Sequence, residues 1–184
     1  MDLVLDRRAV APILESAGIP NEAVSEALVE RLMVLSAGEP LLLSLYAEDL
    51  INIARSGGQV GVEALEFMSS GFSAYFSRAF DAQRVAGVQG TQEVADATLA
   101  VLAMAFGPLE GAHLTDLVCR FGALPRPAAS GRFIEPLKRF IAGDGRADHG
   151  FVLNHPKLGQ YLREERFDSS TQQSVEQTFI DWGR

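Results

Sequence analysis

Gly38 and Pro40 stand two residues apart, between two stretches in which apolar side chains recur at helical spacing. A glycine can take the left-handed conformation that ends a helix. A proline at the first helical position loses no hydrogen bond, because that N–H has no intrahelical partner. The spacing predicts a tight turn between a helix over residues 22–36 and another over residues 40–55, with Tyr46 outside the apolar face of the latter. On geometry alone, the segment is an interhelical turn.

The remainder of residues 1–88 continues this helical pattern. Asp6 is a suitable N-cap for a first helix that ends near Ala17, because its side-chain oxygen can accept from the first turn. A fourth helix is predicted to begin at Val62 and to continue through Phe80, with many aromatic residues on it. Four helices in a segment of this length predict a small helical bundle as the first domain.

Residues 89–168 are predicted to form a second domain. Apolar periodicity indicates three helices, over residues 92–106, 109–118 and 128–141. The glycine- and aspartate-rich segment 143–150 then predicts the tip of a hairpin, and Phe151–Leu153 predicts its returning strand. Three helices followed by a hairpin wing are typical of a winged helix. Residues 169–184 predict a further amphipathic helix, or the start of a following region.

Composition restricts the classes of function. No apolar stretch approaches the roughly 18 residues of a membrane-spanning helix, so we expect a cytoplasmic protein without a membrane partner. The single cysteine, Cys119, cannot form an internal disulfide and is predicted to be a small core residue. The net charge of −8, from 16 basic and 24 acidic side chains, opposes binding to nucleic acid, which depends on neutralised phosphates.

The segment from Gly38 to Leu43, Gly-Glu-Pro-Leu-Leu-Leu, resembles an element of a known family. It is similar to the Gly-x-Pro-Leu element in the helical lid of STAND-class signalling NTPases, the NACHT and NB-ARC relatives of the AAA+ ATPases. In that family the proline contacts the adenine of a bound nucleotide. The resemblance implies an AAA+-type lid over residues 1–88 and a nucleotide contact at Gly38 and Pro40.

The segment Phe151–Leu162 resembles the strand–histidine–helix segment that closes the winged helix of the same family. NB-ARC members carry Met-His-Asp there, and their histidine contacts the β-phosphate of ADP. In this chain Asn154 stands at the first position and Pro156 replaces the aspartate, so the resemblance extends to His155 alone. An imidazole can donate a hydrogen bond to phosphate in either protonation state. The alternative is that His155 only caps the following helix.

Several catalytic signatures are missing from the sequence. Neither of the two lysines, Lys138 and Lys157, follows the glycine-rich loop that a Walker A phosphate site requires. There is no Gly-x-Ser-x-Gly elbow, and the three histidines lack metal-ligand spacing. The chain alone is therefore predicted to be no enzyme and to hold no metal or cofactor. The resemblance places ATP or ADP in a P-loop ATPase core of the same protein.

The function that the resemblance implies is regulatory. In this family the lid and the winged helix close over ADP and hold an inactive state, and exchange for ATP permits self-association. One alternative is a winged-helix transcriptional regulator, although Glu135 interrupts its basic patch and the domain is acidic overall. The candidate nucleic-acid contacts would be Arg132, Lys138, Arg139 and Arg146. A second alternative is a plain protein–protein interaction module.

Overall fold

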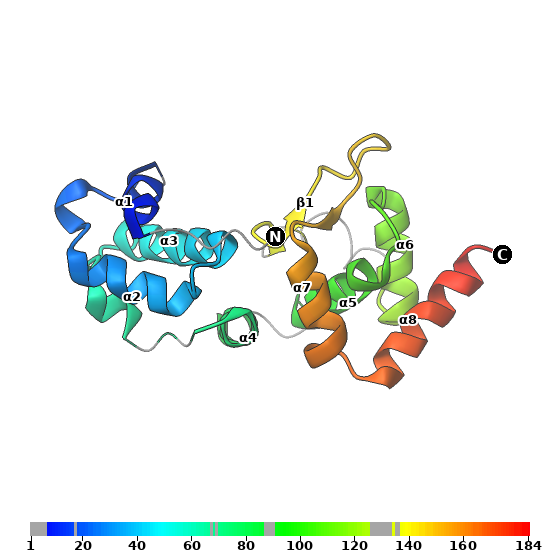
Figure 1. The fold of residues 1–184 in the computed structure, drawn as a ribbon. Helices are drawn as coiled ribbons and strands as arrows, with labels where there is room; N and C mark the ends of the chain where they lie inside the picture. The colour runs from blue at the N-terminus through cyan, green and yellow to red at the C-terminus, as the bar shows by residue number, and fades with distance from the viewer. Residues whose placement is uncertain are drawn as a thin grey trace. The chain divides into compact units, whose positions relative to one another are not determined.

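A computed structural model describes residues 7–16, 18–66, 68, 70–86, 91–125, 134 and 137–184. Within these residues the chain is mainly helical and contains one two-stranded antiparallel sheet, as Figure 1 shows. The contacts divide the chain into an N-terminal unit, Met1–Tyr75, and a C-terminal unit, Phe76–Arg184. This division falls inside helix α4 (Phe72–Ala86), earlier in the chain than the boundary predicted near residue 88.

The described helices of the N-terminal unit follow the predicted order, but two of the predicted helices are interrupted. Apart from the start of α4, they are α1 (Arg7–Ser16), the 3-10 helix η1 (Asn21–Ala23), α2 (Glu26–Ser36), α3 (Pro40–Arg55) and the 3-10 helix η2 (Val62–Leu65). The helix predicted over residues 22–36 breaks before α2, because Ser25 is extended and acts as its N-cap. The Ser25 hydroxyl accepts the N–H of Leu28 at 3.2 Å.

The core of the N-terminal unit is formed where α1, α2 and α3 pack against one another. Its members are mainly leucines from these helices, and they include Leu14, Leu28, Leu32, Leu35, Leu42, Leu43 and Leu50. Tyr46 is also fully buried, and its ring meets that of Tyr75 edge to face at 5.0 Å. The prediction that Tyr46 lies outside the apolar face of α3 was therefore wrong.

Arg31 of α2 holds the segment that follows η2. Its Nη2 atom donates to the backbone carbonyl oxygens of Leu65, Glu66 and Met68, at 3.3, 3.4 and 3.2 Å. The Leu65 carbonyl also accepts the N–H of Met68 at 3.1 Å, so the backbone makes a 3-10 hydrogen bond here and not an α-helical one. The prediction of a continuous helix from Val62 through Phe80 was wrong, because the chain leaves the helical conformation between η2 and α4, where Gly71 has φ +89°.

We expect Arg31→Met to lower the free energy of unfolding by about 1–2 kcal/mol. Methionine keeps much of the apolar stem but removes the donor shared by three carbonyl groups. Urea denaturation would measure the loss, with Arg55→Met as the matched control because Arg55 is exposed at the end of α3. Equal losses in the two variants would show that these hydrogen bonds contribute nothing to stability.

The C-terminal unit contains helices around a short hairpin. After α4, its elements are α5 (Thr91–Met104), α6 (Gly111–Phe121), β1 (Ile141–Ala142), β2 (Val152–Leu153), α7 (Pro156–Tyr161), the π-helical turn η5 (Leu162–Arg166) and α8 (Ser169–Trp182). Strands β1 and β2 pair antiparallel, with Ile141 opposite Leu153. The predicted returning strand and C-terminal helix are confirmed. In Figure 1, α5, α6 and α8 lie against one another, as their contacts also show.

Two predicted helices of this unit need correction. Helix α6 begins at Gly111 and not at residue 109, because the backbone of Leu109 exchanges two hydrogen bonds with Phe151, at 2.9 and 2.7 Å. Most of the helix predicted over residues 128–141 lies outside the described residues. Its described end is a turn over residues 137–140, and Ile141 belongs to β1.

Four aromatic side chains, Phe76, Phe80, Phe140 and Tyr161, form the aromatic cluster at the core of the C-terminal unit. The ring centroids of Phe80 and Phe140 lie 4.9 Å apart, and those of Phe76 and Tyr161 lie 5.4 Å apart. Cys119 is buried, as predicted. Among the described residues, no helix combines the length and the apolar character needed to cross a bilayer.

Candidate functional site

The turn between α2 and α3 has the backbone conformation that the sequence predicts. Gly38 is buried in the left-handed region at φ +75°, and its N–H donates to the Ser36 hydroxyl at 3.3 Å. Pro40 is the first residue of α3 and follows the extended N-cap residue Glu39. The preceding Ala37 is also left-handed, at φ 50°, so the turn comprises three residues. The nucleotide contact expected at Gly38 and Pro40 stays a prediction.

His155 is the N-cap of α7. It follows the hairpin strand β2 closely, and its Nδ1 atom accepts the N–H of Lys157 at 3.1 Å. Capping, the alternative role expected for this residue, is therefore present. Because Nδ1 is the acceptor, the neutral ring carries its proton on Nε2, which is then the donor atom of the side chain. His155 belongs to the C-terminal unit, whereas Gly38 and Pro40 belong to the N-terminal unit.

Three of the four candidate nucleic-acid contacts lie within the described residues, and Arg132 lies outside them. Lys138 is exposed in the turn before β1. Arg139 is half-buried, and its guanidinium carbon lies 5.3 Å from the centroid of the Phe140 ring. The packing of Arg139 on this ring limits its reach toward a phosphate backbone.

The hairpin tip carries the fourth candidate, Arg146, among acidic residues. Its Nε atom lies 3.3 Å from a carboxylate oxygen of Asp144, and Asp148 adds a second exposed carboxylate next to His149. Two carboxylates oppose one guanidinium group while the histidine is neutral. This balance disfavours contact between the tip and nucleic-acid phosphates.

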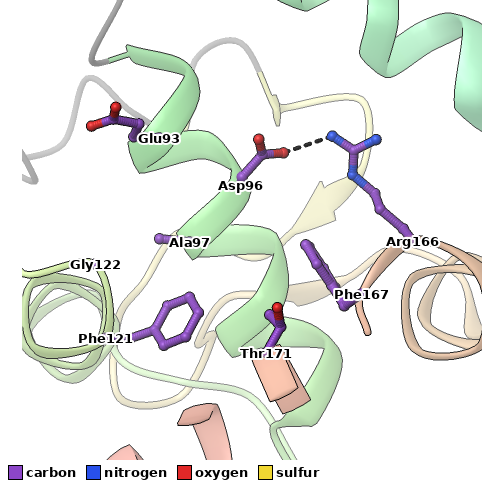
Figure 2. A pocket seen from close by; sticks show the side chains of 8 residues that line it. All are labelled: Glu93, Asp96, Ala97, Phe121, Gly122, Arg166, Phe167 and Thr171. Atoms are coloured by element: carbon purple, nitrogen blue, oxygen red, sulfur yellow. Dashed lines mark hydrogen bonds and ion pairs between the residues drawn. The ribbon is translucent and has the colours of Figure 1, made fainter. Parts of the chain in front are cut away.

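A cavity of about 470 Å³ lies between α5, the end of α6 and the start of α8 in the C-terminal unit. We call it the α5–α8 cavity. It is lined by Glu93, Asp96, Ala97, Phe121, Gly122, Arg166, Phe167 and Thr171. Figure 2 shows that Glu93, Asp96 and Ala97 all come from α5 and that Asp96 points toward Arg166. None of these residues was predicted as a site residue.

Hydrogen bonds hold several of the charged side chains in and beside this cavity. One carboxylate oxygen of Asp96 accepts from Arg166 Nη2 at 2.7 Å, and the other accepts from Gln92 Nε2 at 3.1 Å. At the start of α8, the backbone N–H of Thr171 and then its hydroxyl hydrogen-bond to Asp168 and lower the pKa of that carboxyl group. Asp168 is consequently ionised at neutral pH, and this cap of α8 is lost only when the pH falls through the lowered pKa.

A second, more apolar hollow of about 550 Å³ lies between the end of α5 and α8. Its lining comprises Ala103, Met104, Ala105, Phe106, Arg163, Glu176, Phe179 and Ile180. Phe106 is fully exposed at its edge, and Ile180 is about half exposed. The Nη1 atom of Arg163 donates to the Ala103 carbonyl at 2.7 Å, which fixes this side chain across the hollow.

The walls of both hollows come from segments that lie far apart in the sequence, so no local sequence pattern indicates them. Asp96 and Arg166 are separated by 70 residues. The one local signal was the pair Glu93 and Asp96, which places two acids one turn apart on a mostly apolar helix. In the described part of the chain, no three potential ligand side chains form a group that could hold a metal ion.

The comparisons with known proteins add no identification to this geometry. Neither protein-family models nor curated proteins nor solved structures give a match to the chain.

Proposed function

We propose that the chain is a regulatory, nucleotide-sensing part of a STAND-like ATPase. In this proposal residues 1–88 act as an AAA+-type helical lid, residues 89–168 act as a winged helix, and a P-loop core elsewhere in the same protein holds ADP or ATP. The chain itself hydrolyses nothing. It closes over ADP in the inactive state, and release of the winged helix after exchange for ATP permits self-association.

The observation that carries the proposal is the position of His155. The residue stands between the end of a hairpin strand and the start of a helix, which is the arrangement that the resemblance requires. Its cap uses Nδ1, so capping does not consume the Nε2–H that a β-phosphate would accept. The two roles weighed for His155 are therefore compatible, because they use different nitrogens.

Two further features support the proposed domain types. An isolated antiparallel bridge between Leu109 and Phe151 ties the segment between α5 and α6 to the hairpin, which is compatible with a winged helix. In the N-terminal unit, Pro40 begins α3 and is partly exposed. Its ring presents an apolar surface with no competing hydrogen-bond donor, which suits contact with an adenine ring.

The proposed switch depends on a difference in free energy between two arrangements of the lid and the winged helix. A nucleotide can shift this equilibrium only by the contacts that differ between the two states. The hydrogen bond from His155 to the β-phosphate is the contact that we assign to the inactive state. Its loss should therefore favour nucleotide release and the active state.

The variant His155→Ser tests this role, because serine keeps an N-cap acceptor for α7 but cannot reach a distant phosphate. We expect the stability of the chain to change by less than about 1 kcal/mol. In the P-loop protein that contains this chain, release of fluorescently labelled ADP should become about 10- to 100-fold faster, the effect of losing one charge-assisted hydrogen bond.

His149→Ser, on the exposed hairpin tip, is the matched control and should leave the release rate unchanged. An ADP release rate that His155→Ser does not alter would refute the sensing role and leave only the cap. Salt-sensitive binding of duplex DNA that Arg139→Ala weakens would instead support the transcriptional regulator.

A further inference from the structure

Two phenylalanine rings line the α5–α8 cavity. Phe121 is the last residue of α6, and Phe167 follows η5; both side chains are half-buried. The face of a phenyl ring carries partial negative charge and attracts cations, while its carbon surface favours apolar groups. The cavity volume of about 470 Å³ suits a small organic molecule or one long side chain.

The charged groups around these rings leave an excess of negative charge. Arg166 is committed to Asp96, and its guanidinium carbon also lies 4.7 Å from the centroid of the Phe80 ring. Its side chain is only 13% exposed, so packing holds it in this arrangement. Glu93 is exposed and makes no hydrogen bond or ion pair within the described residues. No described side chain pairs with its charge at the cavity wall (Figure 2), and only the amino end of α5, whose first turn contains Glu93, partly offsets it.

The carboxyl end of α6 makes the electrostatic potential in the cavity more negative. The carboxyl end of α6 lies in the wall at Phe121 and Gly122, where backbone carbonyls contribute partial negative charge. The positive end of α8 is already compensated, because the Asp168 carboxylate accepts the N–H of Thr171 at 2.7 Å. An anion in the cavity would meet Glu93, and the one cation among the described lining residues, Arg166, already pairs with Asp96 through Nη2, although its buried Nε has no hydrogen-bond partner.

We propose that the α5–α8 cavity binds an organic cation, a guanidinium or alkylammonium group carried on an apolar stem. The cationic group would lie near Glu93, and the stem would lie between Phe121 and Phe167. This site is independent of the nucleotide contacts proposed above, since it uses none of the same residues.

Butylguanidinium is the probe, and butylurea is its neutral control of nearly the same shape. In amide NMR spectra of the labelled chain, we expect saturable shifts at Ala97, Gly122 and Phe167 with butylguanidinium and none with butylurea. Glu93→Gln should weaken binding by about fivefold at low salt, as expected for one partly exposed ion pair. Asp148→Asn removes the same charge at the hairpin tip and should leave binding unchanged.

A binding experiment with a peptide distinguishes two sources of such a cation, a side chain of a protein partner and a free small molecule. If a peptide with one arginine binds more than about tenfold more tightly than butylguanidinium, and its citrulline version does not, the natural ligand is a side chain of a protein partner. Similar affinities for the two probes would assign the site to a free small cation. The proposal is overturned if millimolar butylguanidinium gives no saturable shift, if butylurea binds equally well, or if both charge variants weaken binding alike.

Discussion

Phe80→Ala is expected to lower the free energy of unfolding of the C-terminal unit by about 3–5 kcal/mol. Phe80 is only 1% exposed and packs against Phe140, at 4.9 Å between ring centroids. The centroid of its ring also lies 6.4 Å from that of Tyr161 and 4.7 Å from the guanidinium carbon of Arg166. Alanine removes all of these contacts and leaves a cavity that such a densely packed cluster cannot fill by small movements.

The single tryptophan provides the measurement. Trp182 lies in α8 of the C-terminal unit, where its ring meets His113 at 5.0 Å, so its fluorescence reports the unfolding of this unit. Phe80→Leu is the matched control and should cost about 1–1.5 kcal/mol, because leucine keeps most of the buried volume. A denaturation midpoint for Phe80→Ala that equals that of Phe80→Leu would show that the cluster adapts to the loss.

The features that the sequence predicted well are local ones. Gly38 and Pro40 predicted the turn and the start of α3, because a left-handed residue and a missing N–H act on the backbone next to them. The hairpin return and α8 followed from turn residues and from apolar periodicity in the same way. Such signals need only the few residues around them, so they can be read without knowing the fold.

The features that the sequence missed depend on distant partners. Tyr46 looked polar within its own helix, yet it is buried because Tyr75 provides an edge-to-face partner 29 residues later. Arg31 donates hydrogen bonds to the carbonyls of Leu65 and Met68 from more than 30 residues away, a contact that no local pattern indicates. The α5–α8 cavity could not be predicted for the same reason, because only folding brings its walls together.

A comparable limit applies to the proposed site. The sequence predicted the backbone on both sides of His155, and it offered capping and phosphate sensing as competing roles. The structure shows that Nδ1 accepts the capping hydrogen bond, so a phosphate contact through Nε2 would not compete with the cap. Which nitrogen acts as acceptor is a matter of side-chain rotation and is not encoded in a motif.

A single methyl group added at Gly143 should strongly destabilise the hairpin that precedes His155. Gly143 lies directly after β1 at φ +97°, a conformation that residues with a side chain rarely adopt. A Cβ atom there would overlap the carbonyl oxygen of Gly150 and lie 2.9 Å from that of His149. These are backbone atoms, so no side-chain rotation can relieve the overlap. We expect Gly143→Ala to cost about 3 kcal/mol, from backbone strain together with displacement of the hairpin.

Gly18→Ala separates the two contributions. Gly18 has nearly the same φ, +96°, but a Cβ atom there would have no neighbour within 4 Å. The control should therefore show strain alone, about 1–2 kcal/mol. Amide hydrogen exchange resolves both sites. Gly143→Ala should reduce protection at Leu109 and Phe151, whose N–H groups each donate to the other's carbonyl and join the hairpin to the segment before α6. Gly18→Ala should instead affect Ile19, whose N–H donates to the Leu14 carbonyl. Undiminished protection at Phe151 in Gly143→Ala would mean that the hairpin tip can move away from the added methyl group without disturbing the strand before His155.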